Sequence, residues 1–162
     1  MAEPAEASNG SIHLAGATLH RCGHVCAFFH DQDEEYRVLT PFIVEGFRKG
    51  DKAFHIVDPK LRGMHLERLQ QAGIDVTQAQ RSGQLEILSW EESYLRDGWF
   101  DQHQTLAFIQ EVLERGKSQG FPHTRIVSHM GWVLEDRPGV NDFLEYEARV
   151  NRILVKYPDP VI

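Results

Sequence analysis

Residues 23–58 constrain the fold of this chain more than any other segment. They resemble a strand, a loop, a helix and a strand, the opening unit of a parallel α/β sheet. In many nucleotide-binding proteins of that layout, the first strand-to-helix turn is a glycine-rich phosphate cradle that ends in Gly-Lys-Ser/Thr. Here the turn over residues 30–35 is His-Asp-Gln-Asp-Glu-Glu, with four carboxylates and no lysine. Carboxylates at that position repel a triphosphate, so the sequence predicts a binding domain and not an ATPase.

Strand-like and helix-like segments alternate along the rest of the chain. Short apolar runs bounded by turn residues predict strands, and apolar residues at helical spacing predict helices. Pro41 is expected to kink or split the first helix near Thr40. The pattern predicts an open, mostly parallel α/β sheet with helices on both faces. The expected strands are 24–29, 52–57, 84–89 and 124–130, and the expected helices are 36–47, 59–73, 101–120 and 141–157.

Composition excludes several classes of protein. The length of 162 residues suits one domain, and the net charge of −7 without a Lys/Arg cluster argues against direct nucleic-acid binding. Cys22 and Cys26 lie too close together for a disulfide scaffold, so we expect reduced thiols in a cytoplasmic protein. No apolar run has the roughly 20 residues of a membrane span. Residues 1–18 are predicted to be a flexible N-terminal tail and 19–162 a single domain.

Polar side chains and large rings gather where the predicted strands end. In open parallel sheets, ligands bind beyond the carboxyl ends of the strands. Polar tips beside aromatic rings are typical of a small-molecule pocket, although loop ends are polar and tryptophans fill gaps in other α/β domains too. We predict that a small, partly apolar molecule binds here against the two tryptophans. The residues at these ends are His30, Asp58, Trp90, Ser128, His129 and Trp132.

Glu147 lies in the middle of an apolar helical stripe, on the same face as Phe143 and Val150. A carboxylate in that position needs a partner or a raised pKa. Arg125 on the fourth strand is the best candidate partner, and strand alternation puts His129 on the same side as Arg125. Two roles stay open for such a pair, since it either pins helix to sheet or faces a ligand.

His20, Cys22, His24 and Cys26 alternate along one segment. In a single extended strand all four point to one face, and they are ligand types for zinc or another transition metal. Side chains two apart on one strand cannot readily surround an ion, so the sequence favours a small core residue at Cys26 and a hydrogen-bonded His24. We predict no metal and no cofactor; the alternative is a metal or redox sensor through His24 and Cys26.

The sequence carries no motif for nucleophilic catalysis. It has no Gly-x-Ser-x-Gly elbow, and neither thiol has an evident base beside it in the sequence. Ser128 and His129 are adjacent, but adjacent residues on a strand face opposite ways. We predict that the chain is not an enzyme.

Several short motifs, in this order and spacing, resemble the MEDS domain, the methanogen/methylotroph DcmR sensory domain, from about His24 to Ile162. The motifs are His-Val-Cys-Ala-Phe-Phe at 24–29, Pro-Phe at 41–42, Glu-Gly at 45–46, Lys-Gly-Asp-Lys at 49–52, Gly-Gln-Leu at 83–85, Met-Gly-Trp at 130–132 and Tyr-Glu-Ala-Arg at 146–149. The resemblance carries the family's His-x-Cys onto His24 and Cys26, its Met-x-Trp onto Met130 and Trp132, and its Tyr-Glu-Ala-Arg onto Glu147. Before Met-x-Trp the family commonly has Gly-Glu, whereas this chain has Ser128-His129, which puts in doubt any ligand chosen by that acid.

The resemblance implies a bacterial or archaeal cytoplasmic sensory module, related to the RecA/KaiC-like α/β fold without its ATP site. Such modules occur alone or joined to DNA-binding, kinase or other signalling domains, and are proposed to sense small organic, hydrocarbon-like compounds. We therefore expect a domain that binds a small organic ligand and regulates a fused or separate signalling or transcription partner. A pure protein-interaction module is a further alternative, and a homodimer is left open. Since a final strand follows the last helix in that family, the chain is expected to be cut within its last strand.

Overall fold

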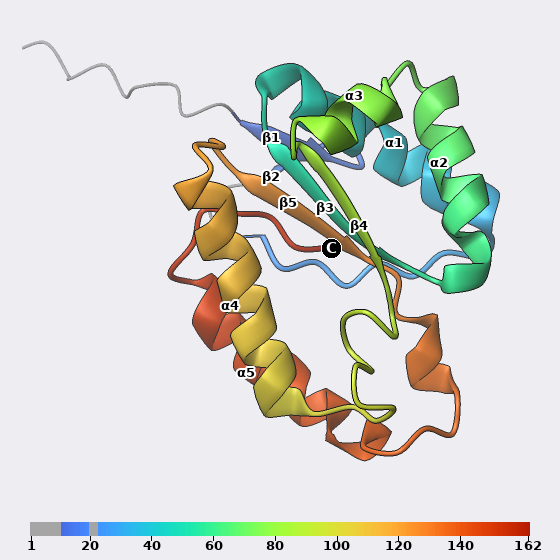
Figure 1. Cartoon of the computed structure of the whole chain (residues 1–162), viewed down its shortest axis with the longest axis vertical. Coiled ribbons are helices and arrows are strands. Elements are labelled where there is room, and N and C mark those ends of the chain that lie inside the picture. Colours follow the sequence, from blue (N-terminus) through green and yellow to red (C-terminus); the bar gives the residue numbers. More distant parts are fainter. Residues whose placement is uncertain (1–10, 20–22) are drawn as a thin grey trace, which may run out of the picture.

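The computed structural model describes residues 11–19 and 23–162. Its central sheet contains β3 (Lys52–Val57), β4 (Leu85–Ser89) and β5 (Thr124–Ser128), paired in parallel in the order β4-β3-β5 (Figure 1). β3 is buried along its whole length, because it lies between the other two strands and is covered on both faces. The predicted open, parallel α/β sheet is confirmed.

Helices cover both faces of this sheet (Figure 1). One face carries α1 (Gln32–Lys49), α2 (Arg62–Gln71) and α3 (Val76–Arg81). The other face carries α4 (Gln102–Ser118) and α5 (Phe143–Leu154). Three short 3₁₀ turns connect these elements, namely η1 (Pro59–Leu61), η2 (Gly131–Leu134) and η3 (Val140–Asp142).

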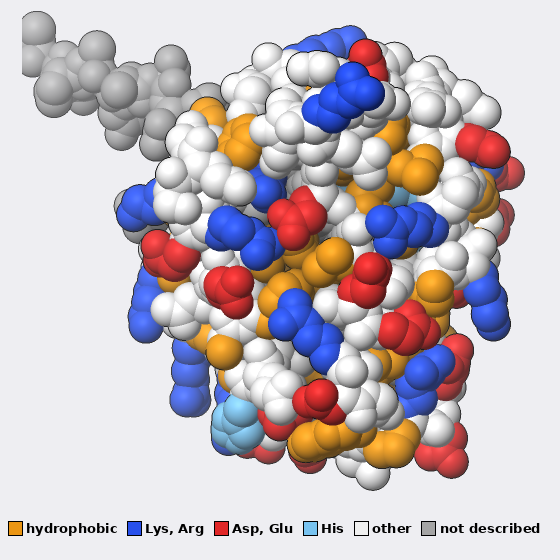
Figure 2. Space-filling view, viewed as in Figure 1, with side chains coloured by type: hydrophobic (Ala, Val, Ile, Leu, Met, Phe, Trp, Pro, Cys, Tyr) orange, Lys and Arg blue, Asp and Glu red, His pale blue; other side chains and the backbone are white. Residues whose placement is uncertain are grey.

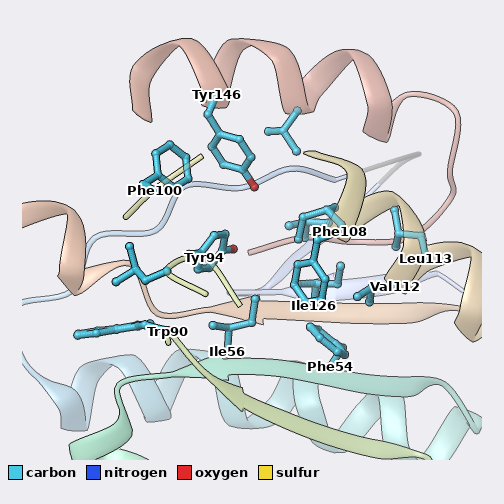
Figure 3. Close-up of a cluster of buried hydrophobic side chains, with 14 of the residues drawn as sticks. Phe54, Ile56, Trp90, Tyr94, Phe100, Phe108, Val112, Leu113, Ile126 and Tyr146 are labelled. Carbon is cyan, nitrogen blue, oxygen red and sulfur yellow. The ribbon is translucent and has the colours of Figure 1, made fainter. Parts of the chain in front are cut away.

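Strand alternation gives each face of the sheet its own core. Phe54, Ile56 and Ile126 pack toward α4 and α5, among aromatic side chains from α5 and from the loop between β4 and α4 (Figure 3). Val57 and Val127 belong to the second core, which lies beneath α1, α2 and α3. A polar side chain on a strand therefore points into one core or the other, and it can contact only the helices that cover that face.

Residues near both ends of the described chain extend the sheet beyond β5. Val161 forms parallel bridges with Ile126 of β5 and with His24. A strand-like segment therefore follows α5, but the strand predicted over 24–29 is reduced to one bridge. Residues 26–28 are exposed, and Phe28 is 94% exposed. The described pairing of this segment runs through Val161 alone, because Pro160 and Ile162 on either side of it direct their backbone groups toward β5.

Two of the predicted helices differ from those observed. α1 continues through Pro41, so the predicted split near Thr40 is wrong. Residues 59–73 form η1 and then α2, and the six-residue α3 that follows was not predicted. Gly73, with φ of 86°, follows α2 in the left-handed conformation that glycine favours.

A β-hairpin lies within the segment predicted as a tail. β1 (Ile12–Leu14) pairs antiparallel with β2 (Ala17–Leu19). Ala15 and Gly16 between them both have positive φ, 50° and 80°, as a type I′ turn requires. Ile12 and Leu14 are buried beside α1. Residues 12–18 thus belong to the folded domain rather than to a flexible tail.

Candidate functional site

The acidic turn before α1 caps the helix. Asp31 is the N-cap residue, and its carboxylate accepts a hydrogen bond of 2.8 Å from the backbone N–H of Glu34. The Glu34 carboxylate in turn accepts a 2.8 Å hydrogen bond from the backbone N–H of His30. In a phosphate-binding loop, N–H groups at a helix start face the phosphate. Here the chain's own carboxylates take that position and complement the helix dipole.

A pocket lies at the carboxyl ends of β3 and β5, on the α1 and α2 side of the sheet. Its volume of about 20 Å³ holds one or two water molecules. Most of its wall is apolar and comes from α1, α2 and the two strands. Its polar lining residues are Glu35, Tyr36, Asp58, His65 and His129. The pocket lies beyond the carboxyl ends of parallel strands, where ligands bind in open α/β sheets.

His129 is fixed in the wall of this pocket. Its backbone N–H donates to the carbonyl oxygen of Ile56 (2.8 Å), and its own carbonyl accepts from Nε1 of Trp90 (2.7 Å). The His129 and Trp90 rings stack with centroids 5.8 Å apart and planes at 17°. Nδ1 of His129 is buried and has no hydrogen-bond partner among the described residues. Leaving such an atom unpaired is costly.

Three side chains continue from the pocket into the protein as a hydrogen-bonded chain. The Tyr36 hydroxyl lies 2.7 Å from Nδ1 of His65, and Nε2 of His65 lies 2.8 Å from Nδ1 of His55. Burial, with a smaller effect of His129, lowers the pKa of His65 to about 4, and burial also lowers the pKa of His55. Burial raises the pKa of Glu35, against an opposing effect of His129. The two inner histidines are therefore neutral at neutral pH.

A second cluster lies on the opposite face, between residues 23–29 and α5. Nε2 of His24 is 3.4 Å from Oε2 of Glu147, and Sγ of Cys26 is 3.8 Å from the same oxygen. Nδ1 of His24 is hydrogen-bonded to Oδ1 of Asn151 at 3.0 Å. Burial raises the pKa of Glu147, and burial together with the Glu147 charge raises the pKa of Cys26. His20 and Cys22, which alternate with these residues in sequence, lie outside the described ranges.

Arg125 is not the partner of Glu147, so that prediction is wrong. Arg125 forms ion pairs with Asp51 (2.8 Å) and Glu45 (3.0 Å). It lies at the start of β5 and faces α1, whereas Glu147 approaches from α5 on the other side of the sheet. The two side chains are thus separated by the sheet itself, and Arg125 is far from the strand tips where a ligand was expected.

The other predicted site residues are dispersed. Trp132 is fully buried in the core beneath α5, so its ring is not open to a ligand. Oγ of Ser128 lies 2.6 Å from the Tyr94 hydroxyl on that same side. His30 is exposed and does not line the pocket. Trp90 is 4% exposed, and it reaches the pocket through its stacking on His129.

The sequence contained weak signs of the residues that were missed. His55 interrupts an otherwise apolar strand, and His65 lies one helical turn before the buried Leu69. Asn151 follows Glu147 by four residues, which puts both on one helical face. Such spacings show that these side chains turn inward, but not which partners they meet.

Acidic and basic side chains are interspersed on the side drawn in Figure 2. That side therefore has no patch of a single charge sign that would attract a charged partner. No helix in residues 11–19 and 23–162 is both long enough and apolar enough to cross a membrane.

A comparison with protein families matches residues 23–161 to MEDS, the MEthanogen/methylotroph, DcmR Sensory domain. The chain belongs to the MEDS family. The match runs from just before His24 to Val161, so the MEDS domain includes both segments that extend the sheet beyond β5. The resemblance drawn from the short motifs is confirmed, and with it the sensory type of domain. Comparisons with curated proteins and with solved structures gave no significant match.

Proposed function

We propose that this MEDS domain senses a small, weakly polar organic molecule, which binds in the pocket at the ends of β3 and β5 and leaves chemically unchanged. The observation that carries the proposal is His129, a ring in the pocket wall whose buried Nδ1 has no hydrogen-bond partner among the described residues. A small molecule with one polar group and an apolar remainder suits a pocket that combines apolar side chains with a few polar ones.

The dimensions of the pocket limit the ligand. A volume of about 20 Å³ admits only about one or two non-hydrogen atoms without rearrangement, by comparison with the space that one water needs. His65 is neutral at neutral pH, so it offers no positive charge to an anionic ligand. The family's sensory description supports the same type of function.

A bound molecule acts by shifting a conformational population. α1 and α2 supply much of the pocket wall, so a ligand that fits one arrangement of these helices stabilises that arrangement. A fused or separate signalling or transcription partner in the cytoplasm then responds to the altered helix face. In this proposal the domain binds and reports but catalyses no reaction.

Tryptophan fluorescence and thermal unfolding test the proposal directly. Trp99 is 43% exposed, so a Trp99→Phe background leaves the two buried tryptophans as reporters, one of them stacked on His129. The probes are short alcohols, aldehydes, nitriles and haloalkanes, with acetate and ammonium as charged controls. A ligand at 100 times its dissociation constant stabilises the fold by about 2.7 kcal/mol, which shifts the Tm by about 5–10 °C.

Two variants locate the effect. Ile43→Phe fills the pocket and His129→Leu removes the ring nitrogen, so both should abolish the response, while His103→Leu on the exposed side of α4 should retain it. Absence of a response to every probe in folded protein, or an equal response in Ile43→Phe, contradicts the proposal.

A further inference from the structure

Three side chains with metal-binding atoms converge from two segments that are distant in the sequence. His24 and Cys26 come from the segment beside Val161, and Glu147 comes from α5. Their nearest ligand atoms all lie within 4.8 Å of one another. Sequence spacing argued against a metal here, because two residues on one strand cannot surround an ion. Glu147, arriving from a helix, supplies the ligand from a second direction that such a site needs.

The separations between these atoms agree with tetrahedral coordination. Zinc bond lengths imply about 3.3 Å between a nitrogen and an oxygen ligand, and about 3.5 Å between a sulfur and an oxygen ligand. The observed distances to Oε2 of Glu147 are 3.4 Å from Nε2 of His24 and 3.8 Å from Sγ of Cys26. Two of the three edges of the site thus have nearly the required length before any adjustment.

Asn151 fixes which nitrogen of His24 is available. Nδ2 of Asn151 donates a 2.8 Å hydrogen bond to the carbonyl oxygen of Glu147, so its Oδ1 is the atom that faces His24. Because that oxygen only accepts, Nδ1 of His24 carries the proton and donates to it at 3.0 Å. In the neutral ring Nε2 then has a free lone pair, directed at Glu147. Metal-binding histidines usually have this arrangement, with the second nitrogen held by an acceptor.

A free lone pair on Nε2 and a carboxylate oxygen 3.4 Å away are both acceptors. They attract one another only if a proton or a metal cation lies between them. The thiolate form of Cys26 would direct a third electron-pair donor toward the same place between His24 and Glu147. Imidazole, thiolate and carboxylate together match the preferences of zinc and its neighbours rather than those of Mg²⁺ or Ca²⁺.

We infer that His24, Cys26 and Glu147 bind a divalent transition metal of the zinc type, with Asn151 as the positioning residue of His24. The site has three protein ligands and an open side, since Cys26 is exposed and the side chains of His24 and Glu147 are 14% and 23% exposed. Three ligands with an open position is the arrangement that admits water or an external ligand as the fourth. The metal would also join the edge segment to α5.

Cobalt substitution tests the site with the untagged full chain. After treatment with a chelator and its removal, the protein is titrated with Co²⁺ and then with competing Zn²⁺. We expect saturable binding of one ion, a near-ultraviolet thiolate-to-cobalt band and visible absorption typical of tetrahedral cobalt. Cys26→Ser should remove the thiolate band. Asn151→Leu should weaken binding roughly 10- to 100-fold, and Glu147→Gln, which replaces a ligand, by at least as much.

A matched control separates this site from other metal binding by the chain. Glu145→Gln, on an exposed position of the same helix, should leave the affinity and the band unchanged, with circular dichroism confirming the fold of every variant. A band that survives Cys26→Ser, or equal affinities in Glu147→Gln and Glu145→Gln, overturns the inference. These readouts do not involve the His129 pocket, so they succeed or fail independently of the organic-ligand proposal.

Discussion

Arg125 and Asp51 form an ion pair of 2.8 Å in which each side chain is only 2% exposed. Arg125 also donates to the carbonyl oxygen of Phe42 in α1, at 2.8 Å, and approaches Glu45 one turn later. Burial alone would raise the pKa of Asp51, but its hydrogen bonds with His123 and Arg125 and the charge of Arg125 lower it. One guanidinium thus joins β5 to the start of β3 and to α1.

Replacing Arg125 by Met should destabilise the domain strongly. The change leaves the buried Asp51 with only His123 as a partner, and breaking a buried pair from one side costs about 3–5 kcal/mol. Urea unfolding followed by circular dichroism measures the loss. Arg137→Met, which removes a half-exposed pair with Glu135, should cost no more than about 1 kcal/mol. Equal losses in the two variants would show that the buried pair has no special role.

Replacement by alanine should lower the stability of the domain at Gly46 and raise it at Gly63. A Cβ at Gly46 would lie 2.7 Å from Cδ and 2.8 Å from Nε of Arg125, so Gly46→Ala should destabilise by about 1–3 kcal/mol. Nothing lies within 4 Å of a Cβ at Gly63 in α2, where alanine should stabilise by up to about 1 kcal/mol. Thermal unfolding of the two variants checks the contrast, and a stable Gly46→Ala protein would contradict the observed approach of Arg125.

Acid should destabilise the domain through His65. The ordinary histidine pKa of 6.5 applies to the unfolded chain, whereas the folded value is about 4. Between these values the unfolded chain binds a proton that the folded chain does not, so stability is full above pH 6.5 and falls as the pH decreases toward 4. The loss is about 3 kcal/mol. Unfolding free energies measured from pH 7.5 to 4 should be less pH-dependent in His65→Gln.

His103→Gln is the matched control for this pH dependence, because His103 is exposed on α4. Its curve should follow that of the unmodified chain. If His65→Gln and His103→Gln give the same slope between pH 6.5 and 4, His65 is not the group responsible.

Replacing Ala15 in the hairpin turn by glycine should raise the free energy of unfolding. The φ of 50° at Ala15 is left-handed, which costs an L-residue roughly 1–2 kcal/mol, and glycine avoids this cost. Part of the stabilisation is lost because glycine has more conformational freedom in the unfolded chain. The expected net stabilisation of Ala15→Gly is up to about 1 kcal/mol. Ala17→Gly, at an exposed strand position, should destabilise by about 0.5–1 kcal/mol. A loss of stability in both variants would argue against the left-handed turn.

Local sequence patterns were sufficient to predict most of the strands of the sheet and the helix α4. β3 and β4 are short apolar runs bounded by turn residues, and α4 begins after the capping residue Asp101, as its sequence indicates. The pocket at the strand ends also follows from general rules for parallel sheets, which is why His129 was found among its candidates.

The partners of Glu147 could not be predicted, because they depend on which helix covers which face. Alternation along β5 says that Arg125 and His129 share a side, and the structure agrees, but it does not say that α5 covers the other side. His24 meets Glu147 only because Val161 inserts between His24 and β5. That neighbour lies at the far end of the sequence and has no local pattern of its own.

The double bridge of Val161 has a mechanical consequence. Its N–H donates to the carbonyl oxygen of Gly23 (2.7 Å) and its carbonyl accepts from the N–H of Val25 (2.9 Å), while residues 160 and 162 are bonded to β5. The segment that carries His24 and Cys26 is therefore hydrogen-bonded to the sheet through Val161. A displacement of Val161 along β5 would move His24 and Cys26 with it. Both side chains would then lie farther from the carboxylate of Glu147 on α5.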